Sequence, residues 1–71
     1  MTELVAHLKA WRTEAGLTQQ ELAERVGVSR KTINTVENGV FVPSTILALK
    51  LAAALGTTVE RLFELRAADA P

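Results

Sequence analysis

The polar residues with the clearest chemistry share the outward arc of one short predicted helix, over residues 30–37. They are Arg30, Lys31, Asn34 and Thr35. Arg and Lys can donate hydrogen bonds to guanine N7 and O6, Asn can pair with adenine N6 and N7, and the Thr methyl can touch the thymine methyl. Ile33 and Val36 take the inward positions. We therefore predict that these four polar residues contact bases in a major groove, near the N-terminal end of the helix.

A second group of short polar residues lies near the ends of this helix and of the preceding one. The segment from Thr18 to Glu21 is a capping box, which begins a helix over residues 19–26. The free backbone N–H groups at such a helix start suit a phosphate oxygen. The residues predicted to contact phosphates are Thr18, Gln19, Gln20, Ser29 and Asn38.

The two helices must be joined by the three residues Gly27, Val28 and Ser29. Gly27 can take a positive φ, and Ser29 can cap the helix that follows. A turn this short, centred on Gly, holds two helices at roughly 90 to 120° and leaves the second one prominent. The segment therefore predicts a helix-turn-helix.

The other periodicities along the chain are helical too. Further helices are predicted over residues 2–15, 45–55 and 59–65. Gly16 ends the first of these, while Ser44 caps the second and Gly56 ends it. The expected fold is all-α, with one five-helix domain over residues 1–66 and a disordered tail over residues 67–71. A chain of 71 residues is too short for a second core.

Composition argues against most enzyme classes. The chain has no Cys and a single His, which excludes a disulfide framework, a thiolate zinc site, a cysteine nucleophile and a cluster of imidazole ligands. We expect no catalysis, no metal and no cofactor.

The longest uncharged run, over residues 40–49, is too short to span a membrane, and Glu3 stands where a signal peptide is basic. A cytoplasmic protein without membrane contact is expected.

Charge gives no global signal for nucleic acid, because eight basic residues balance eight acidic ones. The order of the residues is more informative about DNA binding than the net charge. The run LTQQELAERVGVSRKTINTVENG, residues 17–39, resembles the helix-turn-helix of the phage repressor and Cro family of transcription regulators, and later segments extend the resemblance over residues 4–65. The family implies a five-helix domain with helix three in the major groove and operators commonly bound by dimers. It also implies an ion pair between Arg12 and Glu37.

Two apolar groups are candidates for a dimer or partner surface. The first departs from the family pattern, because valines flank Phe41 where a basic and a polar residue are usual. It comprises Val40, Phe41, Val42 and Ile46. The second lies in the predicted last helix and comprises Val59, Leu62, Phe63 and Leu65. Either group offers apolar surface suited to a partner.

The sequence therefore predicts a sequence-specific DNA-binding transcriptional regulator. We expect a repressor that binds a palindromic operator in double-stranded DNA as a homodimer. The alternative is an antitoxin-like interaction module that binds a partner protein and regulates its own operon, because the same fold serves both functions. A small enzyme is a third class, but it needs a site that the sequence does not contain.

Overall fold

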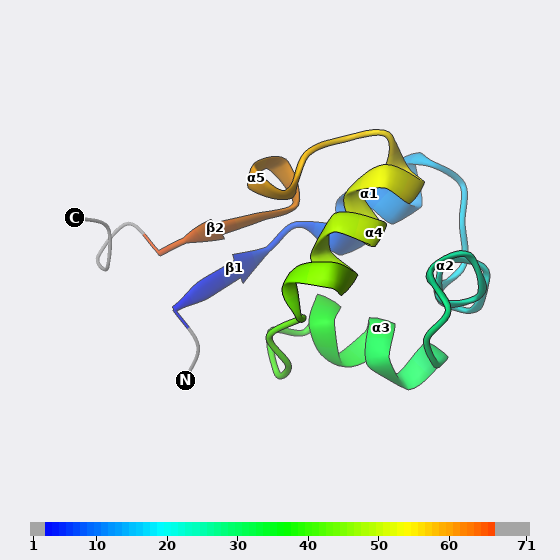
Figure 1. Cartoon of the computed structure of the whole chain (residues 1–71), viewed down its shortest axis with the longest axis horizontal. Coiled ribbons are helices and arrows are strands. Elements are labelled where there is room, and N and C mark those ends of the chain that lie inside the picture. Colours follow the sequence, from blue (N-terminus) through cyan, green and yellow to red (C-terminus); the bar gives the residue numbers. More distant parts are fainter. Residues whose placement is uncertain (1–2, 67–71) are drawn as a thin grey trace.

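A computed structural model describes residues 3–66 of the chain, and Figure 1 shows its arrangement. The elements in chain order are β1 (Leu4–Ala6), α1 (Leu8–Glu14), α2 (Gln19–Val26), α3 (Arg30–Glu37), α4 (Thr45–Leu55), α5 (Val59–Leu62) and β2 (Phe63–Leu65). The predicted bounds of α2, α3 and α4 are confirmed. The predicted disordered tail, residues 67–71, lies outside the described residues.

The first and last predicted helices were too long, because each gives way to a short strand. β1 and β2 pair antiparallel, with Leu4 opposite Leu65 and Ala6 opposite Phe63. The pairing satisfies backbone groups that a helical turn would otherwise satisfy. At the junction, the His7 backbone N–H donates to the Leu62 carbonyl over 2.8 Å. Residues 3–66 still form five helices in the predicted order, extended by a minor two-stranded sheet (Figure 1).

The core draws on every helix and on β2. Its largest fully buried side chains include Leu8 of α1, Leu22 of α2, Ile33 of α3, Leu51 of α4 and Leu62 of α5. Each helix thus turns one apolar face to a common centre, and the opposite faces stay available for function. Among residues 3–66, no helix is long and apolar enough to cross a membrane.

The α2 and α3 pair has its ends fixed by the residues that the sequence indicates. Thr18 and Glu21 form the capping box of α2, and Ser29 accepts from the Thr32 backbone N–H at the start of α3. Gly27 ends α2 with a φ of 75°, a left-handed conformation that favours glycine. Figure 1 shows α2 nearly end-on and α3 from the side, so the two helices cross steeply. This is helix-turn-helix geometry.

Candidate nucleic-acid interface

The α3 helix divides into a buried and an exposed face. Ile33 and Val36 are buried in the core, whereas Arg30, Lys31 and Asn34 are exposed. The exposed three begin at the first residue of the helix, and they alternate with the buried positions as a period of 3.6 requires. The structure therefore brings these three predicted base-contacting residues together on one outward surface.

Thr35 is placed differently from the other three, because its side chain is half-buried. Its hydroxyl donates to the Thr32 carbonyl over 2.9 Å. The single hydroxyl proton is thereby engaged, so Thr35 can still offer a methyl group and an acceptor lone pair.

An ion pair fixes the C-terminal end of α3 to α1. The Arg12 Nε lies 2.5 Å from Glu37 Oε2, and its Nη2 lies 3.3 Å from Oε1. A third donor, Arg12 Nη1, reaches the Leu17 carbonyl over 2.8 Å. The side chains are only 13% and 2% exposed, respectively. One guanidinium therefore ties together α1, the loop before α2 and the last residue of α3.

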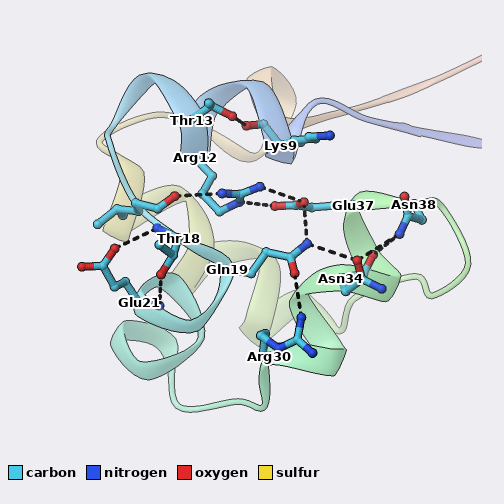
Figure 2. A network of polar contacts seen from close by, with 11 residues as sticks. Lys9, Arg12, Thr13, Thr18, Gln19, Glu21, Arg30, Asn34, Glu37 and Asn38 are labelled. Atoms are coloured by element: carbon cyan, nitrogen blue, oxygen red, sulfur yellow. Dashed lines mark hydrogen bonds and ion pairs between the residues drawn. The ribbon is translucent and has the colours of Figure 1, made fainter.

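Gln19 connects this ion pair to the exposed face of α3, as Figure 2 shows. Its Nε2 donates to Glu37 Oε1 over 3.0 Å and to Asn34 Oδ1 over 3.1 Å. Its Oε1 accepts from Arg30 Nη1 over 3.4 Å. The Gln19 side-chain amide, which we expected to contact a phosphate, thus forms hydrogen bonds with three side chains of α3.

Asn38 continues the network past the end of α3. Its Nδ2 donates to the Asn34 backbone carbonyl over 2.9 Å and to the Asn34 Oδ1 over 3.2 Å. Asn38 is exposed, so it lies at the surface beside the reading face. The Asn34 carbonyl also accepts from the Asn38 backbone N–H over 3.1 Å, so Asn38 holds the last turn of α3 with its backbone and its side chain.

The other residues predicted to contact phosphates form the N-terminal ends of α2 and α3. Thr18 and Ser29 cap these helices, and the Gln20 amide donates to Glu24 over 3.2 Å. The helix geometry directs the backbone N–H groups of Gln19 and Gln20 out of the start of α2. An anion is favoured at this position by those N–H groups and by the helix dipole.

Glu21 strengthens the same helix start. The hydrogen bond from the Thr18 backbone N–H, over 2.8 Å, lowers the pKa of the Glu21 carboxyl below its ordinary value of 4.5. A group whose pKa is lowered by folding stabilises the fold above its unfolded pKa, and this contribution is lost as the pH falls through the folded value. The capping box therefore holds α2 at neutral pH and weakens in acid.

The two apolar groups proposed as partner surfaces differ in their exposure to solvent. The side chains of Val40, Phe41, Val42 and Ile46 are all exposed, with Phe41 at 47%. In the second group Leu62 and Phe63 are core residues, 0% and 7% exposed, so they are not available as a surface. The helix that was expected to present them ends at Leu62, and β2 turns Phe63 inward. Val59 is half-buried against the core, and Leu65 is exposed.

An apolar groove extends the first group along α4. Its lining comes from the loop before α4, from α4, from the turn into α5 and the start of α5, and from one residue of each strand. It includes Leu4, Val42, Leu49, Val59 and Phe63. Leu49 is 58% exposed, a large apolar side chain on the outer face of a helix. Sequence reasoning missed Leu49, although it adjoins the core residues Leu47 and Ala48 within one apolar run.

Two further sets of long-range contacts were not predicted from the sequence. His7 Nε2 lies 2.6 Å from Glu64 Oε1, which joins the start of α1 to β2 across 57 residues. The Gln19 contacts with α3 span 11 to 18 residues. No spacing rule indicates such pairs, because they depend on how the helices pack.

Within residues 3–66, no cluster of three acidic, His or Cys side chains could hold a metal ion.

Comparison with known proteins agrees with this geometry. The family model described as Helix-turn-helix matches residues 8–62. An HTH-type transcriptional regulator of Methanothermobacter thermautotrophicus is 57% identical over 49 residues, which are 69% of this chain and 71% of the relative. The regulator SinR in complex with DNA has a TM-score of 0.69 and 31% identity, covering 75% of this chain and 86% of SinR.

A third match concerns a longer protein. The clp gene regulator ClgR from Corynebacterium glutamicum has a TM-score of 0.72 and 33% identity, and 76% of this chain is covered. The chain spans only 57% of the ClgR chain. The shared part comprises the helical fold described above. Since the family model covers most of the sequence and a relative is more than half identical, the chain belongs to the Cro/C1-type helix-turn-helix family of DNA-binding transcriptional regulators.

Proposed function

We propose that the protein is a repressor that binds a palindromic operator as a homodimer, with the N-terminal half of α3 in the major groove. One observation carries this proposal: Arg30, Lys31 and Asn34 are exposed together at the start of a helix that is fixed at its far end by a buried ion pair. Such a surface can donate hydrogen bonds to base edges without reorganising first. No catalytic step is part of this function.

Phosphate contacts would orient α3 in the groove. The start of α2 offers backbone N–H groups to one phosphate, and the exposed Ser29 and Asn38 flank α3 at its two ends. Such contacts set the register on the duplex without reading sequence. The structural neighbour SinR was solved with DNA bound, which supports the same mode of binding here.

The homodimer is proposed from the charge balance. The net charge is zero, so one copy offers few phosphate contacts, each of which contributes a slope of only about −0.9 in log affinity against log salt. A two-fold dimer doubles the base and phosphate contacts. With recognition helices about 34 Å apart, it would read half-sites with centres about 10 base pairs apart.

Selection of bound duplexes from a random pool, at stated salt concentration, tests the function. We expect enrichment of a palindrome with half-site centres about 10 base pairs apart. A direct repeat or a single half-site would contradict the symmetric dimer. Failure to enrich any sequence would contradict operator binding itself.

The dimer seam is proposed to lie along the groove between α4 and α5, with a second copy as its occupant. Leu49→Asp should weaken dimerisation at least about tenfold, because a buried Leu contributes about 1.5 to 3 kcal/mol. Leu65→Asp is the matched control, since Leu65 has a similar exposure of 53% but lies on β2 outside the groove. Sedimentation velocity at micromolar concentration would measure both. If the Leu65→Asp dimer dissociated and the Leu49→Asp dimer did not, the dimer interface would instead lie at the β1–β2 sheet.

A second candidate function follows from the exposed loop. Val40, Phe41 and Ile46 present apolar surface beside the C-terminal end of α3, where an antitoxin-like protein could bind a partner protein. Tagged protein would be purified from its native host with and without the Phe41→Asp substitution. A stoichiometric partner that is lost with Phe41→Asp would favour this function, whereas a duplex selected with no partner present favours the repressor.

A further inference from the structure

The orientation of the Gln19 amide is fixed by an acceptor-only neighbour. The Glu37 carboxylate is ion-paired with Arg12 and can only accept hydrogen bonds. The Gln19 group that lies 3.0 Å from Glu37 Oε1 must therefore be the NH₂. Its second hydrogen is then available to Asn34 Oδ1, 3.1 Å away, and its oxygen faces the donor-only guanidinium of Arg30.

The orientation of the Asn38 amide, on the other side of Asn34, is also fixed by an acceptor-only neighbour. Its Nδ2 lies 2.9 Å from the backbone carbonyl of Asn34, which is again an acceptor only. The NH₂ of Asn38 must therefore point toward Asn34, where it also reaches Oδ1 over 3.2 Å. The side-chain oxygen of Asn34 thus lies between two NH₂ groups, as Figure 2 shows.

This arrangement decides what Asn34 can offer to DNA. Both lone pairs of its oxygen are engaged by Gln19 and Asn38, so its NH₂ is the group left for a ligand. Bidentate pairing with adenine needs an oxygen acceptor for N6 as well as a donor for N7. A turned amide would place the Asn34 NH₂ against two other donors and lose two hydrogen bonds.

We propose that Gln19 and Asn38 lock Asn34 as a hydrogen-bond donor, so that this residue contacts an acceptor on DNA and cannot form the bidentate pair that selects adenine over guanine. The acceptor is N7 of either purine, guanine O6, thymine O4, or a phosphate oxygen. Arg30 and Lys31 are donors by their chemistry, so all three exposed residues of the reading face favour the same kind of partner. The inference depends on the proposed binding of operator DNA by α3, and it revises the adenine pairing that the sequence alone predicts.

The first test compares the parent with Asn34→Ala in duplex selection. A base contact predicts that Asn34→Ala relaxes one position per half-site and that the parent does not prefer adenine over guanine at this position. A phosphate contact predicts a uniform loss of affinity with an unchanged consensus. Either loss should be about 5- to 150-fold. A preference for adenine over guanine that Asn34→Ala abolishes would overturn the proposal, and failure of the parent to bind any duplex would overturn it together with the proposed function.

The second test releases the lock through a positioning residue. Gln19→Met keeps the side-chain length but removes the donors to Asn34 and Glu37, so that only the Asn38 amide still holds the Asn34 oxygen and the Asn34 amide turns more easily. If Asn34 contacts a base, Gln19→Met should raise the relative affinity for adenine at that position. If Asn34 contacts a phosphate, adenine preference should stay unchanged and the Asn34 NH₂ should lose its fixed orientation, which side-chain amide NOEs in the free protein would report.

Lys50→Met is the control, because Lys50 is exposed on α4 and lies outside α2 and α3. It should change neither adenine preference nor the NOEs of Asn34. Circular dichroism melts would verify that each variant is folded before its binding is compared. Free rotation of the Asn34 amide in the folded parent protein would overturn the lock directly, whatever DNA the protein binds.

Discussion

Breaking the Arg12–Glu37 ion pair from one side is expected to cost about 3 to 5 kcal/mol of unfolding free energy. The side chains are 13% and 2% exposed, respectively, so Glu37→Leu leaves a largely buried guanidinium and Arg12→Met leaves a buried carboxylate. Glu37→Leu also deprives the Gln19 amide of an acceptor. A domain of this size has a total stability of roughly 4 to 11 kcal/mol, so either variant should be close to unfolding.

The double variant Arg12→Met/Glu37→Leu is the control for this prediction. It removes both charges and replaces them with apolar groups, so it should lose much less than the sum of the single losses. Urea denaturation of the parent, the two single variants and the double variant would measure the coupling. Single variants as stable as the parent would contradict a stabilising role for the ion pair.

The consequences of this ion pair extend beyond stability. Glu37 is the acceptor that orients Gln19, and Gln19 in turn contacts Arg30 and Asn34 on the exposed face. A variant that unpairs Glu37 but stays folded should therefore also change base preference. In this fold one charge pair is thus part of the core and also the support of the proposed reading surface.

Local chemistry explains how much of the fold could be predicted. Thr18 and Ser29 cap helices because their side-chain oxygens lie within reach of a backbone N–H three residues on, and this distance is set by the chain itself. Gly27 ends α2 because its φ of 75° suits a residue without a side chain. The bounds of α2, α3 and α4 follow from such signals, as does the division of α3 into a buried and an exposed face.

The contacts that were missed depend on residues far apart in the sequence. Leu4, Leu8 and Trp11 have helical spacing, yet Leu4 is in a strand because Leu65 lies opposite it. For the same reason Phe63 is buried and not part of a last helix. The adenine pairing predicted for Asn34 rests on its residue type alone, whereas the two amides that donate to its oxygen come from α2 and from beyond the end of α3.

The second large effect is expected in DNA binding, from removal of the cations at the start of α3. Arg30→Ala and Lys31→Ala should each cost about 1 to 3 kcal/mol per half-site on the selected operator, and the double variant about 2 to 6 kcal/mol if the losses add. Each cation supplies donors that alanine lacks, so one or two base positions should also lose their preference. Fluorescence anisotropy with operator and scrambled duplexes would separate the loss of specificity from the loss of affinity.

Lys9→Ala is the matched control for the charge removed. Lys9 is exposed on α1, and in Figure 2 it lies on the opposite side of the polar network from Arg30. It should leave the consensus unchanged and alter affinity only through a weak, screened field. If Arg30→Ala and Lys31→Ala kept both the affinity and the consensus of the parent, α3 would not be the reading element. If they weakened all duplexes equally, both cations would bind phosphates, and base readout would then fall to Asn34 and Thr35.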